Sequence, residues 1–379
     1  MKLRDALQIV VYGRGFFHGV LFGDWIRLLK ENRFARTRSQ WFVYSMITFS
    51  SVLNSAIHCW EVLRFRSGIR KAKINPPIFI LGGWRSGTTL LHILFGKDER
   101  FAYPNYIQVM NPHTFLSAEW FFTKVVDAAA PETRGIDNMA SGSRLPEEDE
   151  YALLLLTGMS YQLDGVFPRS SKQYKRFLTF RNATEDETFR WKDALQFFVR
   201  KLSYKYHRPL VLKSPAHTGR IRMILDVFPD AKFIYIHRNP FEVFQSYFQM
   251  LKKFATVFSV TDNSGEILTN HTFEVYKELN TAFFEERNLI PKGHYCEIGY
   301  EDLTQNPIGE LRRIYQELDL PDFEVAEPEV SRYLASIADY KRNKLTDLSP
   351  ELRSRIVNEW NRLFVEWGYS TEEAVSKPE

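Results

Sequence analysis

The first part of the chain has the spacing of hydrophobic residues that is typical of helices. Apolar side chains recur at three- and four-residue intervals, first at Phe22, Trp25, Leu28 and Leu29 and again at Val52, Ile57, Trp60 and Leu63. We expect residues 1–70 to be helical, up to the break at Asn75-Pro76-Pro77. Residues 39–60 carry no formal charge. Their serines, Asn54 and His58 make this segment more polar than is typical of a membrane span of ~20 predominantly apolar residues, so we expect a helix packed on the body, with a span as the alternative.

Short apolar runs farther along the chain predict strands that are buried on both faces of a sheet. They occupy residues 78–81, 210–212, 232–236 and 294–298. Helical segments alternate with them, including a crossover helix over residues 220–228. This alternation predicts an α/β fold, a P-loop-type doubly wound parallel sheet flanked by helices, with an N-terminal helical extension.

The pattern also predicts how the chain is divided. Residues 1–74 form the helical extension, residues 75–345 the α/β domain, and residues 346–379 a C-terminal helix and tail. Within the domain, residues 100–200 read as helices and loops that would cover the site and contact an acceptor. Aromatic residues in that region are candidates for lining an acceptor pocket or for filling the core: Tyr103, Tyr106, Phe115, Trp120, Phe121, Phe122, Tyr161 and Phe167.

Composition narrows the class of protein. The chain has 50 basic and 46 acidic side chains, a net charge of +4, which argues against a nucleic-acid partner but permits a local cationic pocket. Cys59 and Cys296 lack metal-type spacing, so neither a metal site nor a disulfide framework is expected. The N-terminus lacks the apolar segment of a signal peptide, and we expect a cytoplasmic protein with peripheral membrane contact permitted. The pattern does not specify an oligomeric state.

A glycine loop follows the first predicted strand. Gly82 and Gly87 have the spacing of a P-loop, whose backbone N–H groups bind phosphate oxygens at a helix N-terminus. The nucleotide triphosphatase version requires a lysine after the second glycine, and here Thr88 occupies that position. This argues against a kinase or ATPase, while Arg85 supplies a cation inside the turn.

Two further strands end in basic residues. Lys213 follows the second predicted strand, and Arg238 follows the third. Because ligands of such sheets bind beyond the C-terminal ends of the strands, these cations and the glycine loop predict one anion site. For both to hold one nucleotide, Arg238 has to lie within ~20 Å of the Ser86–Thr89 amides.

At these motifs the sequence resembles the sulfotransferases that use 3′-phosphoadenylyl sulfate (PAPS). The resemblance covers roughly residues 76–345, and it is closer to the broad, mainly bacterial group than to the cytosolic phenol and steroid enzymes. It implies that the loop holds the 5′-phosphosulfate, that an arginine and a serine hold the 3′-phosphate, that a tyrosine contacts adenine, and that a late basic loop closes the site. The matching residues are Arg85, Ser86, Gly87, Thr88 and Thr89; Arg238 and Ser246; Tyr300; and Arg342, Asn343 and Lys344.

The sequence departs from the phenol and steroid enzymes at two positions. Their strand-end Lys-Thr-His reads Lys213-Ser214-Pro215 here, so the usual base histidine is absent, and their adenine-stacking tryptophan is Leu90. The candidates for the base are Glu148, Asp149, His217 and His113. Glu148 and Asp149 belong to an acidic run, residues 147–150, and like-charge repulsion within this run would raise one carboxyl pKa towards neutrality. Alternatively, these acids stabilise a helix N-terminus with Pro146 at its first position.

The resulting hypothesis is metal-independent, in-line transfer of a sulfuryl group from PAPS to a hydroxyl or amine, with release of adenosine 3′,5′-bisphosphate (PAP). Arg85 and Lys213 are assigned to the departing oxygen, where side-chain cations can neutralise developing charge. The acceptor can be a small molecule, a lipid or a carbohydrate. The alternatives are a P-loop phosphotransferase and a non-catalytic protein that binds PAP or PAPS.

Overall fold

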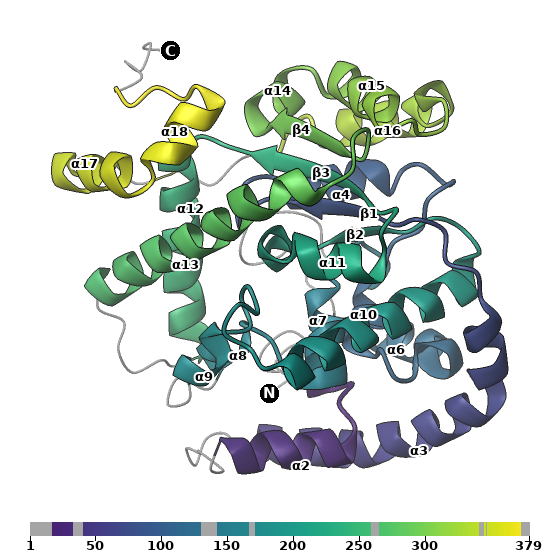
Figure 1. Cartoon of the computed structure of the whole chain (residues 1–379). Coiled ribbons are helices and arrows are strands. Elements are labelled where there is room, and N and C mark those ends of the chain that lie inside the picture. The colour runs from purple at the N-terminus through teal and green to yellow at the C-terminus, as the bar shows by residue number, and fades with distance from the viewer. Residues whose placement is uncertain are drawn as a thin grey trace.

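A four-stranded parallel sheet with the order β2-β1-β3-β4 forms the centre of the molecule (Figure 1). The computed structural model describes residues 17–32, 41–129, 142–166, 171–258, 265–340, 345 and 347–372. The strands are β1 (Ile78–Leu81), β2 (Val211–Lys213), β3 (Lys232–His237) and β4 (Tyr295–Gly299). Each lies within one residue of its predicted bounds, which confirms the predicted strands and the α/β fold.

The register of the strands brings their C-terminal ends to one edge. Ile80 of β1 is aligned with Lys213 of β2 and with Ile234 of β3. His237 at the end of β3 is aligned with Gly299 at the end of β4. The segments that follow the strands therefore start side by side, which positions the site.

Each strand contributes to a hydrophobic core on both faces of the sheet. In β1, Phe79 and Leu81 belong to one core and Ile78 and Ile80 to the other. This alternation follows from the two-residue period of a strand. It explains why the runs are apolar throughout: both faces are covered.

Helices cover both faces (Figure 1). The smaller core is closed by α4 (Thr88–Phe95), α14 (Tyr300–Gln305), α15 (Pro307–Glu317) and α16 (Glu327–Ser336). Helices contributing to the larger core include α7 (Glu150–Thr157), α10 (Glu185–Tyr206), α11 (Ile221–Val227), α12 (Pro240–Phe258), α13 (Gly265–Glu286), α17 (Pro350–Glu359) and α18 (Asn361–Trp367). Other elements between the strands are α5 (Tyr106–Met110), α6 (Phe115–Ala129), α8 (Leu163–Val166), α9 (Ser171–Lys175) and the 3-10 helix η5 (Pro215–Gly219).

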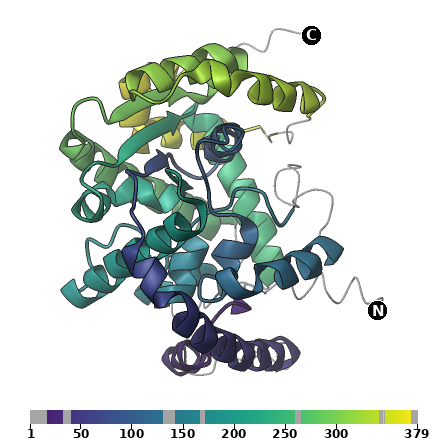
Figure 2. The same ribbon diagram turned by 90° about the vertical axis from the view of Figure 1, so that its right-hand side faces the viewer.

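The N-terminal part is helical, as predicted, within the described residues. Helices α2 (Phe22–Glu31) and α3 (Trp41–Lys71) lie along the lower edge of the molecule, far from α15 and α16 (Figures 1 and 2). Helix α3 packs on α6 and α10. Among the described residues, no helix has the length and apolar character needed to cross a membrane. The division of the chain at residues 75 and 345 stays a prediction.

Candidate active site

The glycine loop connects β1 to α4 through a backbone that few residues adopt. Gly87, the residue before α4, has φ of 104°, and Gly82 has φ of 140°. Arg85 has φ of 71° without being a glycine. Such left-handed geometry costs a non-glycine residue roughly 1–2 kcal/mol, so the surrounding contacts have to hold it in place. The loop is closed by the Ser86 hydroxyl, which donates a hydrogen bond to the Gly83 carbonyl over 2.8 Å.

The loop leaves no room for a side chain at Gly87. A Cβ atom at this position would lie 2.3 Å from the ring of Tyr300, the first residue of α14. Tyr300 therefore packs directly on the loop. This requirement explains the second glycine of the motif independently of its positive φ.

An aromatic cluster holds the outer side of the loop. Trp84 stacks on Tyr247 of α12 with ring centroids 5.8 Å apart, and it contacts Tyr161 at the same distance. The Tyr276 hydroxyl of α13 donates a hydrogen bond to the Trp84 carbonyl. The hydroxyl of Tyr161 lies 2.6 Å from Nε2 of His271. Tyr161 therefore packs against the loop instead of lining an acceptor pocket.

The predicted nucleotide-binding residues converge on Arg85. Its Nε atom donates a hydrogen bond to the Ser246 hydroxyl over 2.9 Å, and its carbonyl accepts one from Nη1 of Arg238 over 3.1 Å. The Arg238 guanidinium lies over the Tyr300 ring, 4.4 Å from its centroid. The guanidinium also forms an ion pair with Glu242, which lies in the first turn of α12. Arg238 thus lies well within the ~20 Å that one nucleotide bound at a helix N-terminus allows.

Residues that sequence reasoning missed fix the end of β3. Glu301 accepts hydrogen bonds from the Asn239 backbone N–H over 3.0 Å and from the Tyr369 hydroxyl over 2.8 Å. His237 stacks on Trp367 of α18 with centroids 4.8 Å apart, and burial lowers its pKa to about 4. In the sequence, Glu301 directly follows Tyr300, and the sequence interpretation used the tyrosine alone.

The catalytic candidates Glu148 and Lys213 form an ion pair. The Lys213 ammonium at the end of β2 donates a hydrogen bond to Glu148 Oε1 over 2.8 Å. The lysine side chain is 2% exposed and the glutamate side chain 16%. The carboxylate is therefore the more accessible of the two groups.

Asp149 and His217 form a second pair behind the first. Asp149 Oδ2 lies 2.6 Å from Nε2 of His217, and neither side chain is exposed. Burial is the strongest influence on Asp149 and by itself raises its pKa, but the charge and hydrogen bond of His217 outweigh it, so the pKa lies below its ordinary value of 3.8. The expected upward shift by like-charge repulsion is wrong for Asp149, because this carboxylate faces a basic partner.

A third pair, Glu150–Arg220, continues the series. Arg220 donates hydrogen bonds of 2.6 and 3.2 Å to the two carboxylate oxygens, which gives bidentate geometry. Its guanidinium lies 5.0 Å from the ring centroid of Phe180 and 5.1 Å from that of Trp191. The sequence analysis missed this pair. The signal was the helical spacing of basic residues 213, 217 and 220 opposite three consecutive acids. We call the three pairs the acid–base ladder.

Other predicted residues have different positions. Helix α7 begins at Glu150, so Pro146 precedes it and pairs with Asn105 instead of opening the helix. His113 is buried beside His58 of α3, with 5.2 Å between ring centroids, and burial lowers its pKa to about 3. Thr88 and Thr89 are the first residues of α4. Arg342, Asn343, Lys344 and Phe167 lie outside the described residues.

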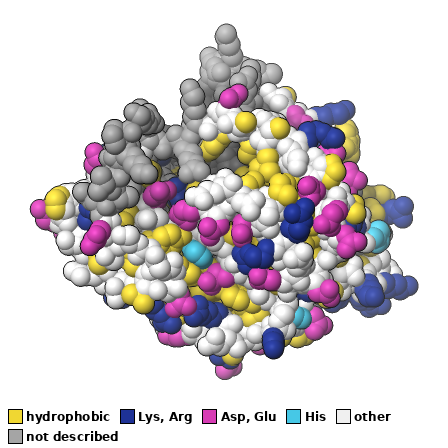
Figure 3. All heavy atoms as spheres, turned by 90° about the horizontal axis from the view of Figure 1, so that it is seen from above, with side chains coloured by type: hydrophobic (Ala, Val, Ile, Leu, Met, Phe, Trp, Pro, Cys, Tyr) yellow, Lys and Arg dark blue, Asp and Glu magenta, His cyan; other side chains and the backbone are white. Residues whose placement is uncertain are grey.

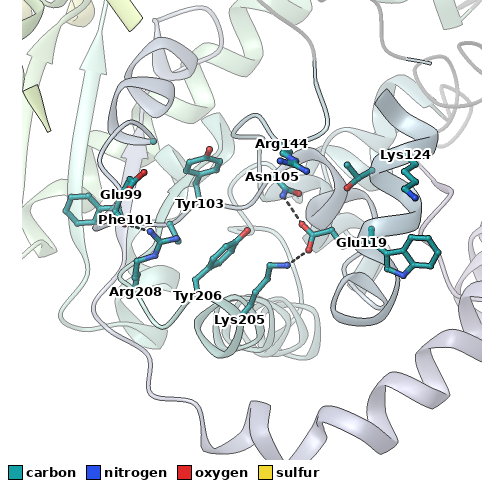
Figure 4. Close-up of a pocket in the computed structure, with 14 residues that line it drawn as sticks. Glu99, Phe101, Tyr103, Asn105, Glu119, Lys124, Arg144, Lys205, Tyr206 and Arg208 are labelled. Carbon is teal, nitrogen blue, oxygen red and sulfur yellow. Dashed lines mark hydrogen bonds and ion pairs between the residues drawn. The ribbon is translucent and has the colours of Figure 1, made fainter. Parts of the chain in front are cut away.

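A cavity of about 880 Å³ lies beyond the β2 edge, between the 96–105 segment, α6 and the end of α10 (Figure 4). Its lining includes Tyr103 and Trp120 from the predicted aromatic set, whereas Phe115 is buried in the core. Glu119 is directed towards Asn105 and Lys205 and pairs with both. None of the described nucleotide-binding or catalytic candidates lines this cavity, which separates it from the loop cluster.

Comparison with known proteins identifies this arrangement. The model of the sulfotransferase family matches residues 76–324, which include the loop, the ladder, Arg238 and Tyr300. The chain belongs to the sulfotransferase family. It is 36% identical over 352 residues to the omega-hydroxy-beta-dihydromenaquinone-9 sulfotransferases Stf3 of Mycobacterium bovis and Mycobacterium tuberculosis, covering 93% of this chain and 90% of each relative.

Solved sulfotransferase structures share the fold. STF9 from Mycobacterium avium superposes with a TM-score of 0.66 at 18% identity, covering 90% of this chain and 88% of that one. STF1 from Mycobacterium tuberculosis H37Rv gives 0.59 at 15% identity, covering 95% and 97%. This protein is thus a sulfotransferase, and its family membership favours that activity over a phosphotransferase or a non-catalytic nucleotide-binding protein.

Proposed function

We propose that this sulfotransferase uses PAPS as its donor and transfers the sulfuryl group to the hydroxyl of a lipid acceptor, releasing PAP. The observation that carries the donor assignment is the contact between Arg238 and the Arg85 carbonyl, supported by the Arg85–Ser246 hydrogen bond. These contacts place a second cation and a hydroxyl beside the phosphate loop. A nucleotide with phosphates at both ends of its ribose requires that second anion site, whereas a triphosphate requires the lysine that Thr88 replaces.

The residues of the loop would hold the 5′ end of the donor. The N–H groups at the start of α4 and the hydroxyls of Thr88 and Thr89 donate to the phosphosulfate. At the other end, Arg238 and Ser246 would bind the 3′-phosphate, and Tyr300 would contact the adenine. Arg342, Asn343 and Lys344 remain part of this proposal as a loop that closes on the 3′-phosphate.

The ladder supplies the chemistry at the reacting centre. The acceptor hydroxyl passes its proton to the Glu148 carboxylate as its oxygen forms a bond to sulfur. The bond from sulfur to the bridging phosphate oxygen breaks, and the electron pair leaves with PAP. Lys213 and Arg85 stabilise the negative charge that develops on that oxygen. Asp149 and His217 are fully buried, so in this mechanism they position Glu148 and Lys213 instead of touching the acceptor.

The acceptor class is proposed from the relatives. The Stf3 proteins are named for a hydroxylated menaquinone, a lipid with a terminal hydroxyl. Their similarity extends over 93% of this chain. We therefore propose a hydroxylated isoprenoid or similar lipid in preference to a carbohydrate or amine.

The test combines a binding and a turnover measurement. Purified protein is titrated with PAP and with ADP, and is then incubated with radiolabelled PAPS and either hydroxylated menaquinone, a phenol or an amino sugar. We expect PAP to bind more tightly than ADP and the label to move to the lipid. In Lys213→Ala, turnover should fall at least about a hundredfold while PAP still binds. Label transfer from ATP without response to PAPS would contradict the donor assignment. Transfer to the phenol or amino sugar alone would contradict the acceptor class.

A further inference from the structure

Helix α3 exposes many apolar side chains while several of its polar side chains are buried. Over its 31 residues the buried positions are Ile47, Ser51, Asn54, Glu61 and Ile69. The exposed positions include eight large apolar residues, which we call the α3 outer face: Trp41, Phe42, Met46, Phe49, Val52, Leu53, Trp60 and Leu63. A helix at the surface of a water-soluble protein normally has the opposite arrangement.

Polar contacts fix the orientation of this helix on the body. Thr48 accepts a hydrogen bond of 2.9 Å from the Trp25 indole, and Ser55 accepts one of 2.9 Å from the Phe22 backbone N–H. Glu61 accepts one of 2.8 Å from the Ser117 backbone and forms a buried ion pair with Lys201 of α10. Turning the outer face inwards would break these contacts and leave the buried charge of Lys201 without its partner, which is costly.

The outer face is continuous along the helix. Phe42, Met46, Phe49 and Leu53 follow one another at intervals of four, three and four residues, and Trp60 and Leu63 continue the same stripe. Phe49 is 71% exposed, Trp60 62% and Leu63 84%. Contiguous apolar surface of this kind marks an interaction site.

Within α3 and the two residues that follow it, the exposed charges have one sign. The C-terminal end of the outer face is followed by exposed basic residues: Arg64, Arg66, Arg70, Lys71 and Lys73. The only acidic residue between positions 41 and 73 is Glu61, which is buried. The opposite face of the molecule, by contrast, carries basic and acidic side chains interspersed (Figure 3).

We propose that the α3 outer face docks this protein on the surface of a bilayer that contains anionic lipids. The apolar side chains enter the boundary between headgroups and acyl chains, with Trp60 at the interface, and the basic residues contact lipid phosphates. Because its polar face is bonded to the body along its length, the helix lies in the plane of the membrane. This partner is inferred from α3 alone and does not depend on the donor chemistry.

The test is vesicle binding by the full chain. Protein is sedimented with vesicles of phosphatidylcholine and phosphatidylglycerol in equal parts, and with phosphatidylcholine alone. We expect binding to the mixed vesicles that is at least about tenfold stronger than to the neutral ones. The triple variant Phe49→Ser, Leu53→Ser, Trp60→Ser should lose most of it, by about tenfold or more. The variant Arg64→Glu, Arg66→Glu, Arg70→Glu should lose the preference for anionic lipid.

Matched controls change the same chemistry elsewhere. Phe189→Ser, Val325→Ser, Val365→Ser removes exposed apolar residues from other elements, and Arg222→Glu, Lys292→Glu, Arg332→Glu makes the same change in net charge. Both controls should bind vesicles like the wild type, and all variants should keep the wild-type far-ultraviolet circular dichroism spectrum and a cooperative thermal transition, which shows that they are folded. The proposal would be overturned if the controls lost vesicle binding equally, or if the wild type did not bind vesicles. It would also be overturned if the wild type formed a dimer that the serine variant dissociates, without any binding to vesicles.

Discussion

Nη1 of Arg238 donates a hydrogen bond to the backbone carbonyl of Arg85 over 3.1 Å, although the two residues are 153 positions apart in the chain. The contact joins the end of β3 to the turn that follows β1. It orients the guanidinium over Tyr300, which itself packs against Gly87. One side chain thus links the parts of the proposed donor site.

Arg238→Ala should weaken PAP binding by roughly ten- to a hundredfold, because it removes a charged hydrogen-bond donor from the proposed 3′-phosphate site. Binding of 5′-AMP, which has no 3′-phosphate, should change little. Isothermal titration with both nucleotides gives the comparison. Glu242→Gln is the control, since it removes the ion-pair partner and leaves the guanidinium in place. An equal loss for both nucleotides would show that Arg238 acts on the loop as a whole.

Arg85→Ala should lower kcat about a hundredfold by removing a cation from the departing oxygen. The residue has φ of 71°, so Arg85→Gly offers a matched variant in which the backbone is relaxed and the charge is equally absent. Both variants should lose the same activity in single-turnover measurements, while the glycine variant has the higher melting temperature. Near-wild-type turnover in the glycine variant would assign the role to backbone geometry instead of charge.

Glu148→Gln should reduce kcat by about a hundredfold or more, with little change in the affinity for PAP, because the amide retains the shape but cannot take the acceptor proton. Glu147→Gln changes the neighbouring acid in the same way and should remain active. Rapid-quench kinetics with saturating donor separate the chemical step from binding. If the two variants have equal activity, the base lies elsewhere.

Asp149→Asn should destabilise the fold by about 3 kcal/mol at neutral pH, because one partner of a buried pair is lost. The folded-state pKa of Asp149 is depressed, so its contribution is present above its ordinary value of 3.8 and is lost as pH falls through the lower folded value. The difference in unfolding free energy between wild type and variant should therefore shrink on acidification. Urea titrations across the acid range measure it. A difference that grows at low pH would contradict the assigned ionisation.

Gly87→Ala should abolish PAP binding for two reasons. The added Cβ atom would lie 2.3 Å from the Tyr300 ring and displace it, and the positive φ would strain the backbone. Gly293→Ala is the control: it also has positive φ, at 82°, but has nothing within 4 Å of the added atom. The control should lose roughly 1–2 kcal/mol of stability from backbone strain alone and bind PAP normally. Differential scanning calorimetry and PAP titration distinguish the two effects. Normal PAP binding by Gly87→Ala would contradict this prediction and show that the loop and Tyr300 can move to accommodate the Cβ atom.

Local signals determined how much of the fold was predictable. The strands were placed within one residue because residues such as Phe79 and Ile80 face different cores and both have to be apolar. The basic residues at the ends of the second and third predicted strands, Lys213 and Arg238, were equally visible in the sequence. The order of the strands was not predicted, because it depends on pairing between segments far apart in the chain.

Site residues that belong to one short sequence motif could be predicted. Site residues that depend on a contact between two distant segments could not. Glu150 read as part of a helix N-terminus because its partner, Arg220, lies 70 positions away. Glu301 was overlooked for the same reason: its contact with Asn239 spans 62 positions. The left-handed backbone of Arg85 has no signature in a single sequence, since arginine does not favour it.

The order of the pairs in the acid–base ladder has a practical consequence for engineering this enzyme. The two inner pairs, Asp149–His217 and Glu150–Arg220, are sealed inside the protein, and only the outermost carboxylate reaches solvent. A library that seeks new substrates can therefore randomise exposed positions around Glu148 while keeping the inner pairs constant. Such a library would diversify recognition without disturbing the strand end that carries Lys213.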